Sequence, residues 1–182
     1  MKITLKKHPE LKLAHKLLQL FPDAIIAGGA ARDLINGKSF KDVDFFIPAP
    51  SPFDLARISI SIGRFAAELK KEETLLEDSY EIAMGGPIRI SIENLDICIL
   101  HESFTAEKLV STFDMVSSQA WLEPVKDGFE ATATEFFYEL NKKKVLGIYE
   151  DVSGSAGHIE RIKEKYPDYL PLSRKRPVNC TC

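Results

Sequence analysis

The sequence of 182 residues predicts an α+β fold, in which helices flank a small mixed sheet. Two observations support this class. Stretches with the two-residue period of strands and the longer period of helices do not alternate strictly along the chain, as they do in a doubly wound parallel sheet. In addition, residues 80–84 and 88–92 alternate around Gly85-Gly86-Pro87, which is typical of a β-hairpin.

The N-terminal part predicts a helix followed by a strand, a short helix and a second strand. Leucines at helical spacing, with a proline in the first turn, predict an amphipathic helix over residues 8–21. A short apolar strand over 24–27 ends at a glycine pair, and a short helix over 30–35 follows it. The second strand covers 43–47, because prolines stop it.

The same signals define the rest of the chain. Apolar spacing predicts a long helix from Pro52 to about Lys71 and a strand from Leu95 to Leu100. Residues 105–112 predict a helix, whereas 116–122 fits either a helix or a strand. Three further elements are predicted in the C-terminal part: a helix at 134–141, a strand at 144–149 and a charged helix at 156–166. The polar tail that begins at Ser173 is expected to be loose.

These elements divide the chain into four segments of one domain. Residues 1–23 are an N-terminal helix packed on the domain, and residues 24–125 are its head. Residues 126–170 are a C-terminal α/β extension of the same domain, and residues 171–182 are a flexible tail. The length supports one domain of ordinary size with a hydrophobic core.

Composition and charge exclude several classes of protein. The chain is 45% hydrophobic and 28% charged, as is ordinary for a globular protein, and its formal net charge is −3. That charge argues against a large nucleic-acid footprint, although it permits local binding of a short strand end. The three cysteines form neither a disulfide framework nor a zinc site. With no signal peptide and no membrane-spanning run, we expect a cytoplasmic protein.

Two aspartates inside an apolar run are the strongest candidates for chemistry. Asp42 and Asp44 would project from the same face of a strand, where adjacent carboxylates repel each other. A divalent metal ion between them relieves this repulsion. Asp96, inside the apolar run at 95–100, would join them if its strand lies beside the strand at 43–47. The alternative for Asp96 is an ordinary turn aspartate, and the metal role is the favoured of the two interpretations.

A glycine pair precedes these aspartates. Gly28 and Gly29 stand at the start of a predicted helix, where backbone N–H groups can bind phosphate, although such a pair is often only a tight turn. The segments Gly28–Asp33 and Lys41–Asp44 together resemble the nucleotidyltransferase superfamily of DNA polymerase β. The resemblance is closest to the head domain of poly(A) polymerases and CCA-adding tRNA nucleotidyltransferases, in a small stand-alone, phage-like variant.

The resemblance implies a palm-type nucleotidyltransferase fold with two Mg²⁺ ions and a nucleoside triphosphate. By this resemblance, Gly28 and Gly29 approach the phosphates and Arg32 assists them. Asp42 and Asp44 hold the metal ions. Arg32 could equally be a structural partner of the aspartate that follows it.

A second, weaker resemblance lies at Phe113–Trp121. This segment is similar to the one with which the same branch contacts the nucleotide sugar and triphosphate, and it assigns a nucleotide contact to Asp114. The family's base-reading Glu-Asp-x-x-Arg element is not found, since Glu150-Asp151 is followed by Val-Ser-Gly. The four histidines show no ligand spacing and are expected to be surface or structural residues.

The sequence therefore predicts a metal-dependent nucleotidyltransferase, which transfers NMP from an NTP to an acceptor hydroxyl and releases pyrophosphate. Asp42, Asp44 and Asp96 would be its catalytic residues. The resemblance implies an RNA 3′ end of the tRNA type as acceptor; transfer to a protein or small molecule, and a catalytically inactive binding module, are the alternatives. RNA could bind the basic clusters at 142–144 and 174–176, and a protein partner or homo-oligomer is compatible with the sequence.

Overall fold

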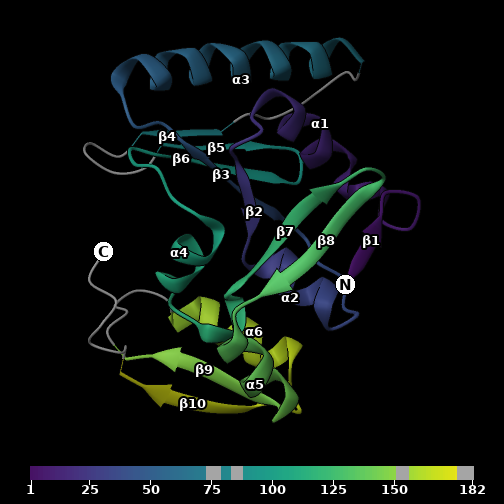
Figure 1. Cartoon of the computed structure of the whole chain (residues 1–182), viewed down its shortest axis with the longest axis vertical. Helices are drawn as coiled ribbons and strands as arrows, with labels where there is room; N and C mark the ends of the chain where they lie inside the picture. Colours follow the sequence, from purple (N-terminus) through teal and green to yellow (C-terminus); the bar gives the residue numbers. More distant parts are fainter. Residues whose placement is uncertain (73–78, 83–87, 151–155, 176–182) are drawn as a thin grey trace.

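An eight-stranded mixed sheet forms the centre of the molecule (Figure 1). The computed structural model describes residues 1–72, 79–82, 88–150 and 156–175. In spatial order the strands are β1 (Lys2–Thr4), β8 (Gly128–Ala133), β7 (Ala120–Val125), β2 (Ile25–Ala27), β3 (Val43–Pro48), β6 (Leu95–Leu100), β5 (Ile88–Ile92) and β4 (Ser79–Ile82). This arrangement confirms the predicted α+β class with a mixed sheet. The predicted turn at 85–87 lies outside the described residues.

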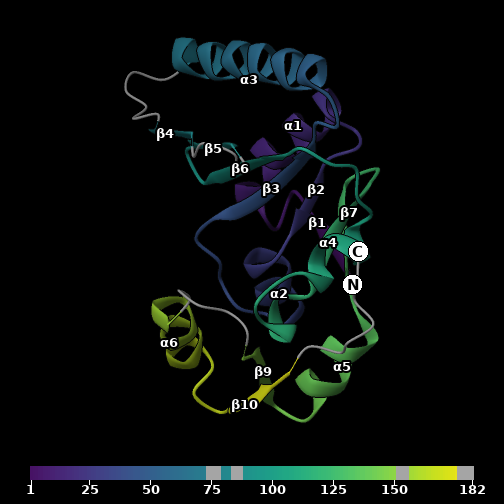
Figure 2. The same ribbon diagram turned by 90° about the vertical axis from the view of Figure 1, so that its left-hand side faces the viewer.

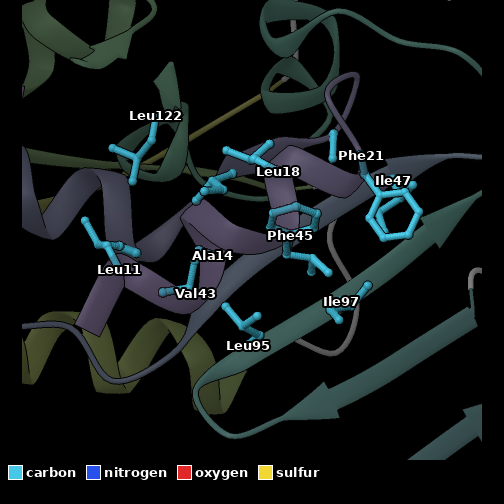
Figure 3. Close-up of a cluster of buried hydrophobic side chains, with 14 of the residues drawn as sticks. Leu11, Ala14, Leu18, Phe21, Val43, Phe45, Ile47, Leu95, Ile97 and Leu122 are labelled. Carbon is cyan, nitrogen blue, oxygen red and sulfur yellow. The ribbon is translucent and has the colours of Figure 1, made fainter. Parts of the chain in front are cut away.

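Helices cover the main sheet and connect its strands. They are η1 (Pro9–Leu11), α1 (Lys12–Leu20), α2 (Gly29–Ile35), α3 (Pro52–Glu72), α4 (Ala106–Ser111) and η2 (Val116–Ser118). Leucines of α1 and isoleucines of α3 pack in one core with the odd-numbered residues of β3 and β6. Figure 3 shows α1 lying across these strands, with Leu11, Ala14 and Leu18 over the sheet.

Buried and more exposed residues alternate strictly along the central strands, so the sheet has one face in the core and one face outside it. Val43, Phe45 and Ile47 of β3 are buried, while the residues between them are only half-buried. The same pattern runs along β6. Because successive side chains of a strand point to opposite faces, the polar residues of both strands lie on the face away from α1. The core therefore fixes which side of the sheet is free for chemistry.

The pairing of β3 with β6 confirms the predicted neighbourhood of the two carboxylate-bearing strands. The two strands are parallel, and Asp44 is the register partner of Asp96. The connection between them runs through α3 and the β4–β5 hairpin, which is long enough to return the chain in the same direction. The predicted hairpin is confirmed as the antiparallel pair β4–β5.

A small C-terminal lobe, residues 135–174, lies below the main sheet (Figure 2). It contains α5 (Glu135–Lys142), β9 (Val145–Tyr149), α6 (Ala156–Lys165) and β10 (Leu170–Arg174), with β9 and β10 paired in parallel. Leu146, Ile148, Ile162 and Tyr166 of the lobe pack in one buried cluster with Met115, which precedes it in the chain. An antiparallel bridge between Met115 and Ile148 connects the lobe to the chain that leads into β7.

Three local features of the structure are absent from the sequence prediction or left open by it. Lys2–Thr4 forms strand β1 on the edge of the main sheet, which its polar composition does not indicate. The ambiguous segment at 116–122 divides into a 3-10 turn and the start of β7. Strand β8 has no counterpart among the predicted elements, and it forms a hairpin with β7 in the main sheet.

The predicted loose tail is wrong for its first residues. Ser173 and Arg174 belong to β10, because pairing with β9 satisfies their backbone groups even though most of the strand is exposed. Residues 176–182 lie outside the described part of the chain. Within the described ranges, no helix combines the length and apolar character that crossing a bilayer requires.

Gly128 allows β8 to pair with β1, and a Gly128→Ala variant tests this. Its φ is 153°, and a Cβ there would lie 2.1 Å from the carbonyl oxygen of Ile3. We expect the free energy of unfolding, measured in urea, to fall by about 2 kcal/mol or more, because the two backbones must separate. Gly63→Ala is the matched control, since its Cβ meets nothing within 4 Å in α3. Gly63→Ala should raise the free energy of unfolding by about 0.5 kcal/mol. Equal effects of the two variants would contradict the conclusion that the close approach of β1 and β8 requires Gly128.

Candidate active site

Three carboxylates gather on the free face of the sheet. Asp44 and Asp96 are register partners on adjacent strands, and Asp42 precedes β3 by one residue. Ser91 of β5 donates a hydrogen bond from Oγ to Asp96 Oδ1, at 2.9 Å. The Asp42 carboxylate is turned toward Lys41, with Oδ2 lying 3.5 Å from Nζ. Among the residues that the structure describes, no group of three or more His, Cys, Asp or Glu side chains is close enough to hold a metal ion.

The charge of Asp44 is opposed by its surroundings. Burial raises the pKa of Asp44 to about 6, and the negative charges of Asp96 and Asp42 add to this rise. The backbone N–H of Gly29 and the nearby His158 act in the opposite direction. The site therefore holds a carboxylate whose ionised form is destabilised, and a bound cation would relieve that cost.

A glycine with an unusual backbone conformation lies close against this carboxylate. Gly28 precedes α2 with a φ of 90°, which favours glycine. A Cβ on Gly28 would lie 3.1 Å from Asp44 Oδ2 and 3.5 Å from the ring of Phe113. The position thus requires glycine twice, once for its φ and once for the close approach of Asp44.

Arg32 is part of a buried ion pair. Its Nε donates to Asp33 Oδ1 at 2.8 Å, its Nη1 donates to Ser118 Oγ at 3.3 Å, and it is only 5% exposed. The alternative that the sequence left open, pairing with the next residue, is therefore what the structure contains. Arg32 still lines the cleft beside the carboxylates, so its charge contributes to the electric field there.

Asp33 also anchors the C-terminal lobe on α2. Its carboxylate accepts hydrogen bonds from Lys165 Nζ and from the Tyr166 hydroxyl, the latter at 2.7 Å. Lys38 Nζ donates to the carbonyl oxygen of Lys165 at 2.6 Å and lies over the Tyr166 ring. One buried anion thus joins α2 to the end of α6, on the side of the molecule seen in Figure 2.

The anchored helix α6 places cations opposite the carboxylates. A cleft of about 480 Å³ is lined by Asp42, Asp44 and Asp96 on one side. Arg161, Lys165 and His158 of α6 line the other side, and the imidazole of His158 is charged only when it is protonated. We name the three α6 residues the cationic face. They recur at i, i+3 and i+7, which places them on one face of a helix. That spacing is the signal in the sequence that points to this face of α6.

Asp114 lies at the edge of the same region. Its Oδ2 is 3.4 Å from His158 Nδ1, and its backbone carbonyl accepts a hydrogen bond from the N–H of Tyr149. Of the predicted site residues, Asp44 lies beside Asp96 in register and against Gly28, while Asp42, Gly29 and Arg32 line the same cleft. Asp114 is connected to them through His158, whose positive charge would lower the pKa of Asp44.

Comparison with known proteins gives a result at the level of the fold. No protein-family model matches the sequence, and no curated protein matches it. Among solved structures, a tRNA-processing enzyme in an apo form is 16% identical, with a TM-score of 0.53 over 81% of this chain and 38% of that chain. A CCA-adding enzyme with ATP is 18% identical, with a TM-score of 0.50 over 80% and 37%.

A third structure, an apo CCA-adding enzyme, is 16% identical, with a TM-score of 0.50 over 93% of this chain and 43% of that one. The chain spans less than half the length of each of these three proteins. This chain therefore shares its fold with part of a tRNA-processing enzyme and with part of CCA-adding enzymes, as the resemblance in its sequence implied.

Removing the charge of Asp44 should stabilise the protein in EDTA. We expect Asp44→Asn to raise the free energy of unfolding by about 2 kcal/mol at neutral pH, because the buried charge and its repulsion disappear. The native pKa of about 6 lies above the ordinary value of 3.8, so wild-type stability should fall as the pH rises through this window. Urea denaturation at several pH values measures both effects. An unchanged pH dependence in the variant would contradict the cause given for the shift.

Asp33 should be among the residues most important for stability. We expect Asp33→Ala to lower the free energy of unfolding by about 3 kcal/mol or more, because Arg32 then remains buried without its anion. Glu160→Ala is the control, since its pair with Lys163 at 2.8 Å is exposed and contributes less than about 0.5 kcal/mol. Similar losses for both variants in thermal denaturation would show that Asp33 has no special role.

Proposed function

We propose that this chain is a metal-dependent nucleotidyltransferase, which transfers NMP from an NTP to an acceptor hydroxyl with release of pyrophosphate. The observation that carries the proposal is the in-register pair Asp44 and Asp96 beside the Gly28 turn, facing a helix that carries cations. A surface with anions on one wall and cations on the other suits a metal–triphosphate complex, which carries both signs of charge.

The carboxylates fit magnesium by their chemistry. Asp42, Asp44 and Asp96 offer only oxygen atoms, which are the ligands that Mg²⁺ prefers, and we assign two ions to them. Bound there, Mg²⁺ would neutralise charge that develops on the reacting phosphate oxygens. The raised pKa of Asp44 agrees with this assignment, because burial first and the neighbouring carboxylates second destabilise its ionised form, and a bound cation would offset both.

The remaining residues bind and orient the triphosphate. We assign phosphate contacts to the Gly28 and Gly29 backbone and to Arg32, and a nucleotide contact to Asp114. Arg161 is exposed on the cationic face and lines the cleft, so it is available to a phosphate that enters from solvent. Fixed positive groups of this kind lower the barrier by stabilising charge without reorganising.

The proposed acceptor is an RNA 3′ end of the tRNA type, and the proposed location is the cytoplasm. The likeness in fold to a tRNA-processing enzyme and to CCA-adding enzymes supports this choice of acceptor. A second candidate is a catalytically inactive binding module. It is supported by the absence, among the described residues, of three side chains already grouped around one metal position.

Label transfer tests the proposal against this alternative. The protein is incubated with Mg²⁺, each α-labelled NTP and total cellular RNA. We expect labelled RNA, and a loss of at least about 100-fold in rate for Asp42→Asn and Asp44→Asn, since the charges that hold the ions are gone. EDTA should abolish the reaction, and the exposed Asp23→Asn variant should retain it. Undiminished transfer by both site variants would refute the metal assignment, and no transfer from any NTP would favour the binding module.

A further inference from the structure

A second cleft shares the two central carboxylates with the first. It has a volume of about 290 Å³, and its walls include Asp44, Asp96, Phe46, Arg89 and Cys98. The first cleft extends from Asp44 back toward Phe40 and Lys41, whereas the second extends forward along β3 to Phe46. Asp44 and Asp96 therefore form the boundary between two clefts that lie in opposite directions along the strand.

Strand register gives the second cleft a floor of two rows. The first row is Ser91, Asp96 and Asp44, which pair across β5, β6 and β3. The second row, two residues away along the same strands, is Arg89, Cys98 and Phe46. Two residues of a strand span about 7 Å. A molecule whose reactive hydroxyl lies at the carboxylates would therefore rest its body on Arg89, Cys98 and Phe46.

The two clefts differ in charge. The first contains Lys41 and the cationic face of α6. Among the described residues that line the second cleft, Arg89 is the single cation. It lies beside the ring of Phe46 and the half-buried thiol of Cys98. Burial raises the pKa of the Cys98 thiol, so this side chain is a small neutral group. The triphosphate, with several negative charges, suits the first cleft, and a ligand with one negative charge suits the second.

In-line transfer also requires the triphosphate and the acceptor to occupy different clefts. The attacking oxygen and the leaving pyrophosphate lie on opposite sides of the reacting phosphorus, with the ions that clamp them between. If pyrophosphate leaves into the cleft under α6, the acceptor hydroxyl approaches from the opposite cleft. The volume of about 290 Å³ lies at the lower limit of small-molecule sites, so it suits one nucleotide and excludes a duplex.

We propose that this second cleft binds the unpaired 3′-terminal nucleotide of a single-stranded RNA acceptor. The base lies against Phe46, and the phosphodiester of that nucleotide pairs with Arg89. Bases of single-stranded ends commonly stack on aromatic side chains, and arginine is well suited to bind phosphate. The proposal rests on the proposed function and adds to it the residues that receive the acceptor.

Binding of a 5′-fluorescent single-stranded oligoribonucleotide with a free 3′ hydroxyl tests this site by anisotropy, without turnover. We expect Arg89→Glu to weaken binding about tenfold or more, because one phosphate contact becomes repulsive. Arg64→Glu makes the same charge change on an exposed position of α3, across the sheet from the cleft, and should leave binding within about twofold of wild type. Cys98→Phe fills the cleft and should also weaken RNA binding, while the affinity for NTP stays unchanged.

The outcomes separate this inference from the proposed function. Equal effects of Arg89→Glu and Arg64→Glu on RNA binding would overturn it. It would also be overturned if Arg89→Glu and Cys98→Phe lowered the affinity for NTP as much as the affinity for RNA. Transfer to a protein hydroxyl that needs Arg89, with RNA binding insensitive to Arg89, would assign the cleft to a different acceptor and overturn it too. Failure of label transfer from every NTP contradicts the proposed function, whereas the anisotropy result bears on the cleft in either case.

Discussion

The parallel pairing of β3 with β6 is the constraint on which the site depends. Its register sets Asp44 beside Asp96, and the alternation of both strands turns these residues away from the core while Val43 and Phe45 are turned into it. A slip of one residue would exchange the two sets and bury the carboxylates. The hydrophobic core therefore enforces the repulsion between the aspartates, and the free energy of packing offsets its cost.

A second level of organisation comes from Asp33. Burying one anion against Arg32, Lys165 and Tyr166 is costly unless each partner is present, and here all three contact it. Their joint contact sets the position of α6, and hence where the cationic face stands relative to the carboxylates. Asp33 thus contributes to the cleft by orienting helix α6, while its neighbour Arg32 serves as its counterion.

The sequence predicted strands β2 to β6 of the main sheet, and with them the neighbourhood of Asp44 and Asp96, because these strands carry clear local patterns. Apolar residues recur at every second position along 43–47 and 95–100, which determines the face of the sheet to which each side chain points. The glycine pair at Gly28 marks the turn between a strand and a helix. The sequence did not predict the role of α6, because helix packing onto Asp33 depends on contacts between residues far apart. Strand β1 was missed for a similar reason, since three mostly exposed residues are held by pairing with β8 and carry little pattern of their own.

The contacts of Asp33 also have a consequence for folding. They join residues separated by 132 and 133 positions, so the loop that closes them includes most of the chain. Closing such a loop costs entropy that only late, cooperative packing repays, and contacts of this range slow folding. During synthesis, the sheet residues that carry Asp44 and Asp96 emerge well before Lys165 and Tyr166. The cleft thus acquires its α6 wall only after Lys165 and Tyr166 have been made, so a nascent chain that has not reached them lacks one half of the site.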